Sequence, residues 1–186
     1  MDEIIALNRL IREHCRVKKI RLVDAYYAFN DGNDNLASEF SNGDGGHLNA
    51  KGYKKLGEFI VTQLTDLLKP GMKVACLGDS ITEGYPGHFV GQEKFRKWDP
   101  YPMYLEKKGV KALNFGRSGD TTDGMIARFF RDVKESGAGL CIVLGGVNDL
   151  FGMVPAQQVF ENLASIYADC QHLSILPVAV TVLPID

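Results

Sequence analysis

The sequence lacks any long run of apolar residues, so a bilayer-spanning helix, which needs about 20 of them, is not expected. It also lacks an excess of one charge, with 21 Lys and Arg against 23 Asp and Glu and a formal net charge of −2. A basic nucleic-acid-binding surface is therefore not expected either. The first residues, Met1 to Ile5, are acidic where a signal peptide is basic. We expect a soluble, cytoplasmic chain that binds no nucleic acid and has no membrane span.

Cysteine is scarce, and its spacing forms no metal or redox motif. The four residues are Cys15, Cys76, Cys141 and Cys170. Cys76 and Cys141 lie inside apolar runs, where cysteine packs as a small hydrophobic residue. We expect buried free thiols in a reducing compartment, with no disulfide framework, no metal site and no cofactor.

The composition, 45% hydrophobic and 24% charged over 186 residues, is typical of a single globular domain. Apolar residues alternate between helical and strand spacing along the chain. Helices are predicted over 2–15, 49–68, 122–133 and 155–169, and strands over 19–23, 73–78, 110–115, 139–144 and 175–183. The helix over 122–133 is predicted to turn inward Met125, Ile126, Phe129 and Phe130. Alternating strands and helices favour parallel pairing and an α/β sandwich.

One stretch, Lys73 to Gly84, joins a buried strand directly to Gly78-Asp79-Ser80. A serine just beyond the carboxyl end of a buried strand lies in the crevice where open α/β sheets bind ligands, which is a suitable place for a nucleophile. The same tripeptide is also compatible with a serine that only caps a helix. The choice depends on what else reaches this edge of the sheet.

Three further polar or glycine-rich stretches follow predicted strands. They are Gly116 to Thr122, Gly145 to Asp149, and Asp44 to His47 at the end of a long loop. Because parallel strands all end on one edge of the sheet, we expect these stretches to meet the Gly-Asp-Ser stretch there. Taken singly, each is also explained as a turn glycine, a loop cap or the entry to a helix. Together they supply nucleophile, base and hydrogen-bond donors.

This set of residues is complete for acyl transfer. His47 can take the proton of the Ser80 hydroxyl while Asp44 fixes the orientation of the imidazole. The main-chain N–H groups of Ser80 and Gly119 and the side-chain amide of Asn148 would form an oxyanion hole. Loss of one such donor typically costs about 10²–10³ in rate.

These stretches resemble the four sequence blocks of the SGNH hydrolases, also called GDSL esterases and lipases. The matching residues are Gly78-Asp79-Ser80-Ile81-Thr82-Glu83-Gly84, Ser118-Gly119-Asp120-Thr121, Gly146-Val147-Asn148-Asp149 and Asp44-Gly45-Gly46-His47. The resemblance implies Ser80 as nucleophile, His47 as base and Asp44 as its partner. It further implies Ser80, Gly119 and Asn148 as the oxyanion hole, and a flavodoxin-like three-layer sandwich with five parallel strands.

The order of the blocks departs from the family, in which the serine block comes first and the Asp-x-x-His block last. Here Asp44 and His47 precede Ser80, so we expect one circularly permuted domain over 1–186. Residues 1–69 would correspond to the family's C-terminal part, 69–72 to the joint and 73–186 to its N-terminal part. Both chain ends should then lie near the rim of the site. An alternative is a domain-swapped dimer, and the sequence leaves the oligomeric state open.

The expected function is therefore that of a carboxylic ester hydrolase acting through an acyl-enzyme on short acyl or O-acetyl esters. The alternative is a catalytically silent flavodoxin-like module that binds a small anion at its strand exits. The segment from Tyr85 to Met103 is interpreted either as core packing or as a pocket wall, through Pro86, Phe89, Phe95, Trp98, Tyr101 and Pro102. Phe151 and Met153 are candidates for lining the same pocket.

Overall fold

The computed structural model describes residues 2–85 and 99–186. Its centre is a five-stranded, all-parallel sheet with the strand order β1-β5-β4-β2-β3. The strands are β1 (Arg21–Val23), β2 (Lys73–Gly78), β3 (Lys111–Gly116), β4 (Leu140–Leu144) and β5 (Leu176–Val180). The predicted α/β class with five parallel strands is confirmed.

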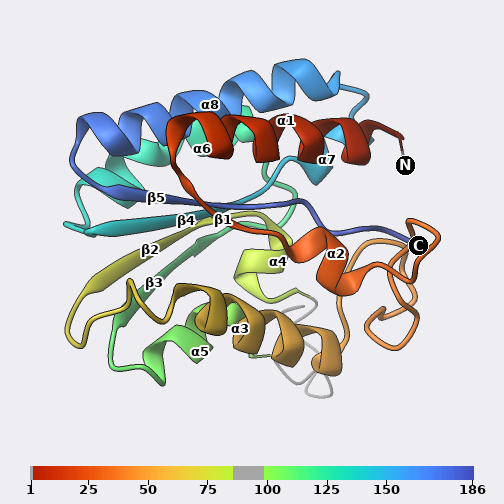
Figure 1. The fold of residues 1–186 in the computed structure, drawn as a ribbon, viewed down its shortest axis with the longest axis horizontal. Coiled ribbons are helices and arrows are strands. Elements are labelled where there is room, and N and C mark those ends of the chain that lie inside the picture. Colours follow the sequence, from red (N-terminus) through yellow and green to blue (C-terminus); the bar gives the residue numbers. More distant parts are fainter. Residues whose placement is uncertain (1, 86–98) are drawn as a thin grey trace, which may run out of the picture.

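Helices cover both faces of this sheet, which gives three layers (Figure 1). One layer holds α1 (Asp2–Lys18), α6 (Thr122–Phe129) and α8 (Ala156–His172). The opposite layer holds α3 (Ala50–Leu64) and α5 (Tyr101–Glu106). Three short helices lie near the carboxyl ends of the strands: α2 (Ala25–Phe29), α4 (Ser80–Glu83) and α7 (Val147–Phe151). We call this side of the sheet the catalytic edge.

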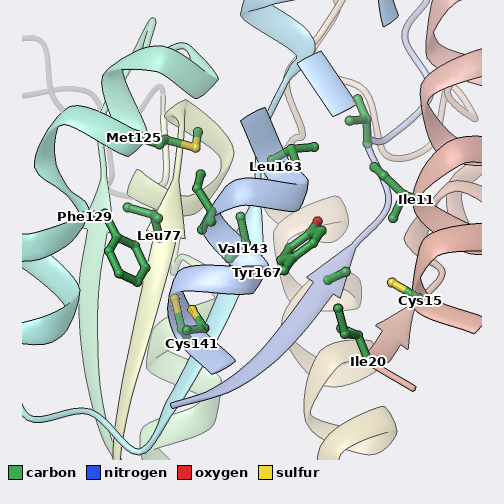
Figure 2. Close-up of a cluster of buried hydrophobic side chains, with 14 of the residues drawn as sticks. Ile11, Cys15, Ile20, Leu77, Met125, Phe129, Cys141, Val143, Leu163 and Tyr167 are labelled. Atoms are coloured by element: carbon green, nitrogen blue, oxygen red, sulfur yellow. The ribbon is translucent and has the colours of Figure 1, made fainter. Parts of the chain in front are cut away.

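The core is divided between the two faces because successive side chains of a strand point to opposite sides. On β2, Leu77 packs with Val143 and Leu163 on the α1 and α8 side, as Figure 2 shows. Its neighbour Cys76 packs with Ile142 of β4 on the α3 side. Both faces of β2 and β4 are thus buried, which explains why these strands read as continuous apolar runs.

The helix predicted over 122–133 is interrupted. Its α-helical part ends at Phe129, and a π-helical turn, η1 (Phe130–Lys134), follows. Met125 and Phe129 are buried as predicted, but the prediction for Phe130 was wrong, because its side chain is 56% exposed. Each residue of a helix turns about 100° from the last, so the position after inward-facing Phe129 points away from the sheet.

The aromatic segment is only partly described, since Pro86, Phe89, Phe95 and Trp98 lie outside the described residues. Tyr101 begins α5 and is fully buried in the core on the α3 side. Core packing is therefore the correct interpretation for this residue.

All four cysteines are free and buried, as expected. Burial raises the pKa of the Cys15 thiol to about 11. Within the part of the chain that the structure describes, no helix has the length and apolar character needed to cross a membrane.

Candidate active site

The turn that follows β2 presents Ser80 at the catalytic edge. A Cβ on Gly78 would collide with the carbonyl oxygen of Leu144, so the exit from the strand requires glycine. Asp79 then caps α4, since its Oδ1 accepts the Ile81 N–H at 2.9 Å. Ser80 is the first residue of α4 and only 5% exposed.

The loop that carries His47 is built from short-range hydrogen bonds. Oδ1 of Asp44 accepts the main-chain N–H groups of Gly46 and His47 at 3.1 and 2.9 Å. Oδ2 of the same carboxyl lies 2.8 Å from Nδ1 of His47, and Nε2 of His47 lies 2.8 Å from Oγ of Ser80. The structure therefore brings Ser80, His47 and Asp44 together in one line of hydrogen bonds, as the sequence predicted.

The ionisation of Asp44 decides which way these bonds run. Partial burial pushes the pKa of Asp44 upward, but the N–H groups of Gly46 and His47 and the His47 imidazole outweigh it and hold the pKa below its usual range. An ionised Asp44 can only accept hydrogen bonds, so Nδ1 of His47 carries the proton and donates to Oδ2. Nε2 is then left to accept the Ser80 hydroxyl, which is the arrangement a general base needs.

The loop after β3 carries Gly119 in a left-handed conformation, with a φ of +76° that favours glycine. Its neighbours are tied to the turn that holds Ser80. Arg117 donates its N–H to the carbonyl of Gly78 at 3.0 Å, and Glu83 Oε2 accepts the N–H and the hydroxyl of Ser118 at 2.6 and 2.5 Å.

Asn148, on α7, reaches the same loop. Its Nδ2 donates to the carbonyl oxygen of Asp120 at 2.8 Å. The next residue, buried Asp149, accepts both the N–H and the hydroxyl of Thr122, with distances of 2.7 to 3.1 Å. Asp149 therefore holds α7 against the start of α6.

A profile of the GDSL-like Lipase/Acylhydrolase family matches residues 76–186. The chain belongs to this family. The match contains Ser80, Gly119 and Asn148 and leaves Asp44 and His47 outside it.

Individual relatives of this GDSL-family chain match it in part. An uncharacterized lipoprotein, YqeF of Bacillus subtilis (strain 168), is 27% identical over 118 residues, 60% of this chain and 49% of that protein. The structure of a G-D-S-L family protein from Desulfitobacterium hafniense DCB-2 has a TM-score of 0.52 at 24% identity, covering 59% of this chain and 58% of that one. The SGNH-hydrolase family esterase AlinE4 is 27% identical with a TM-score of 0.49, covering 60% and 59%. The chain thus spans about half the length of the curated relative it matches.

Beside the turn from Gly78 to Ile81 lies a small cavity of about 20 Å³, bounded by Gly46, Asp79, Ile81, Leu144, Val182 and Ile185. This volume is close to the ~10–15 Å³ that one buried water requires. Phe151 and Met153 lie outside this cavity on the surface, where they are 60% and 89% exposed. Among the described residues, no group of three or more His, Cys, Asp or Glu side chains is arranged to hold a metal ion.

Two residues contact the loops of the candidate site but were given no role in it by the sequence analysis. Arg128 is buried among the loops of the catalytic edge, and Glu83 holds Ser118. The burial of Arg128 could have been predicted from its spacing. It stands three residues after Met125 and directly before Phe129, on the inward face of the predicted helix. A charge at such a position indicates a buried ion pair.

Proposed function

We propose that this GDSL-family chain hydrolyses carboxylic esters through an acyl-enzyme on Ser80. The observation that carries the proposal is the position of His47, whose two ring nitrogens each lie 2.8 Å from an oxygen, one of Ser80 and one of Asp44. A hydroxyl, an imidazole and a carboxylate in this order form the arrangement that activates a serine for attack on an ester.

In the first half of the reaction, Oγ of Ser80 attacks the ester carbonyl carbon while its proton passes to Nε2 of His47. The imidazolium is stabilised by Asp44 and gives this proton to the departing alcohol. In the second half, His47 takes a proton from water, which attacks the carbonyl carbon of the acyl-enzyme. The bond from that carbon to Oγ of Ser80 then breaks, His47 returns the proton to Oγ, and the acid leaves. Asp44 stays ionised throughout and keeps Nδ1 protonated.

The negative charge on the carbonyl oxygen is bound by the N–H groups of Ser80 and Gly119 and by the side-chain amide of Asn148. Asn148 has two N–H bonds, and only one of them is needed for the hydrogen bond to the Asp120 carbonyl. The second remains for the oxyanion. Such donors act because they are held in place before the charge develops.

The substrate we propose carries a short acyl group, such as acetyl on an alcohol or a sugar. The small cavity bounded by Asp79 and Ile81, the two chain neighbours of Ser80, supports this choice, because its volume of about 20 Å³ suits a methyl-sized group. The exposed Phe151 ring, 3.9 Å from the Cβ position of Gly46, offers an apolar surface next to the His47 loop for the alcohol portion.

Hydrolysis of p-nitrophenyl acetate tests the proposal. Ser80→Ala and His47→Ala should each lower kcat by at least about 10³-fold. Two matched controls, Ser38→Ala at an exposed serine and His14→Ala at a histidine that packs on Phe160, should leave kcat within about 2-fold. A fluorophosphonate probe should label Ser80, as located by peptide mass.

Equal turnover by the wild-type chain and Ser80→Ala would rule out the covalent route. A wild-type chain that binds inorganic phosphate but turns over no ester would instead favour the anion-binding module.

We also propose that these 186 residues hold the family's domain in permuted order, with residues 1–69 in the place of its C-terminal part, 69–72 as the joint and 73–186 in the place of its N-terminal part. Counted from β2, the strand order becomes 2-1-3-4-5, that of flavodoxin-like sheets. The family match covers only residues 76–186, which also supports this order. Both ends of the chain lie toward the catalytic edge (Figure 1), and the N–H of Asp186 donates to the carbonyl of Gly45 in the His47 loop at 3.2 Å.

A rearranged chain tests the permutation. Residues 73–186, a short Gly/Ser linker and residues 1–72 should give a monomer on size-exclusion chromatography, with p-nitrophenyl acetate turnover within about 10-fold of the original chain. A rearranged chain that does not fold, or an original chain that is active only as a dimer, would contradict this proposal. The second result would favour domain swapping.

A further inference from the structure

Arg128 of α6 is a buried cation at the catalytic edge, with 4% of its surface exposed. Its guanidinium makes three hydrogen bonds in three directions. Nε donates to Oδ2 of Asp120 at 2.7 Å, Nη1 to Oδ2 of Asp132 at 2.9 Å, and Nη2 to the carbonyl of Gly78 at 3.0 Å. The reaction steps at Ser80, His47 and Asp44 do not involve this residue.

Two of these partners belong to the segments that carry the oxyanion donors. Gly78 stands two residues before Ser80, and Asp120 directly follows Gly119. The third donor, the side-chain amide of Asn148, is held through Asp120 as well, because its Nδ2 donates a hydrogen bond to the Asp120 carbonyl. One guanidinium therefore contacts the segments of Ser80 and Gly119 directly and reaches Asn148 through Asp120.

The Gly119 loop needs such a restraint. Gly119 is exposed and has a φ of +76°, and apart from its two chain neighbours none of the described residues places an atom within 4 Å of where its Cβ would be. Arg117 and Ser118 hold the loop to the Ser80 turn on the side before Gly119. On the side after it, Asp120 provides the restraint, next to a glycine that is conformationally permissive. Donors that must reorganise during the reaction lose most of their catalytic effect.

We propose that Arg128 is a positioning residue that fixes the oxyanion donors of Ser80, Gly119 and Asn148 relative to one another. The inference rests on the proposed function, because only an oxyanion gives these three donors a common task. Arginine suits this role and lysine does not, since a planar guanidinium donates along several fixed directions while an ammonium is a compact point charge.

The chain offers a matched pair of variants. Asp120 and Asp132 are both acceptors of the same guanidinium and are both largely buried, with side chains 13% and 9% exposed. Only Asp120 belongs to the Gly119 loop. Asp132 lies on η1 and is also paired with Arg131 at 2.7 Å. Among the residues that the structure describes, Asp132 reaches the loop only through an ion pair with the exposed side chain of Arg117, at 3.7 Å. Asp120→Ala and Asp132→Ala therefore remove the same chemical group from the same cation, but only the first cuts the link between that cation and the residue next to Gly119.

The experiment compares Arg128→Lys, Asp120→Ala and Asp132→Ala with the wild-type chain. With p-nitrophenyl acetate, Arg128→Lys and Asp120→Ala should lower kcat about 10- to 100-fold and leave KM within about 2-fold, since donors that act in the transition state are misplaced. Asp132→Ala should keep kcat within about 2-fold. The melting temperatures of the two Asp variants should be similar, which separates positioning from general stability.

Amide hydrogen exchange of residues 116–121, measured on peptides by mass spectrometry, gives a second result that needs no turnover. Arg128→Lys and Asp120→Ala should speed this exchange at least about 10-fold, and Asp132→Ala should not. Unchanged exchange and kcat in folded Arg128→Lys, or equal effects of the two Asp variants, would overturn the inference. If Arg128→Lys does not fold, the two Asp variants decide. If no Ser80-dependent hydrolysis occurs at all, the proposed function fails, while exchange still decides whether Arg128 restrains the loop.

Discussion

Asp79 connects β2 to Ser80, and its side chain is 1% exposed. Burial raises the pKa of this carboxyl from 3.8 to about 7, against the hydrogen bond from the Ile81 N–H, and the charges of Asp120 and Asp149 add to the rise. Between about pH 4 and pH 7, the folded protein therefore keeps a proton on Asp79 that the unfolded chain has released. Since the folded state then binds more protons, the free energy of unfolding must fall as the pH rises through this window.

The substitution Asp79→Asn removes this dependence. Asparagine has the same shape, stays neutral at every pH and can still accept the Ile81 N–H as a helix cap. The difference between 3.8 and about 7, at about 1.4 kcal/mol for each pH unit, amounts to about 4 kcal/mol. We expect the variant to be about 1 kcal/mol more stable than the wild-type chain at pH 4.5, where the unfolded carboxyl is already largely ionised, and about 4 kcal/mol more stable at pH 8.

Urea unfolding at pH 4.5, 6 and 8, followed by circular dichroism, measures this difference. Asp169→Asn serves as a control, because Asp169 lies near the end of α8, close to where β5 begins and far from the catalytic edge. A dependence on pH that appears with Asp79→Asn and not with this control arises at the catalytic edge. If Asp79→Asn gives the same offset at all three pH values, the Asp79 carboxyl titrates as it does in water and the reasoning from burial is refuted.

Three further predictions concern other parts of the site and the core. Asp44→Asn should lower kcat for p-nitrophenyl acetate at least about 10²-fold with little change in KM, because the tautomer of His47 is no longer fixed; an unchanged kcat would contradict the role given to Asp44. Asn8→Ala should lower the free energy of unfolding in urea by about 2–4 kcal/mol, because the buried N–H and C=O of Val182 both lose their hydrogen-bond partner. The control Arg9→Ala, at an exposed residue, should change this free energy by less than about 0.5 kcal/mol. Ellman's reagent should modify fewer than one of the four buried thiols per folded chain and all four in urea; rapid modification of the folded chain would show that the cores open.

The part of the site that the sequence predicted best is the part set by sheet geometry. Ser80, Gly119 and Asn148 each follow a strand, β2, β3 and β4, and a parallel sheet brings its strand ends to one edge. Local spacing was enough to find these strands. His47 was placed at this edge as part of the long loop that follows the strand predicted over 19–23. Because that loop has no regular periodicity, the spacing alone does not fix where its last residues lie. The resemblance of Asp44-Gly45-Gly46-His47 to a family block gave the placement further support.

The supporting contacts could not be predicted in the same way. Arg128 and Gly78 are 50 residues apart, and Asn8 and Val182 are 174 residues apart. Whether such polar groups meet depends on how whole layers pack, which the spacing of apolar residues does not describe. The change from α6 to the π-helical turn has a similar cause. Apolar spacing predicts which face of a helix is buried, but not where the hydrogen-bond pattern of its last turn will shift.

The long loop that carries His47 is hydrogen-bonded to the segment that follows β5. Leu36 donates its N–H to the carbonyl of Ile185 at 3.0 Å, and Oγ of Ser41 donates to the Asp186 carboxylate at 2.5 Å. The segment itself continues a strand that pairs with β4, whose end leads to Asn148. Neighbouring strands of one sheet therefore connect the loop that carries the base to the turn that carries the nucleophile. Because a sheet keeps its register whichever strand comes first along the chain, the order of the blocks is free to vary while the hydrogen bond between His47 and Ser80 stays in place.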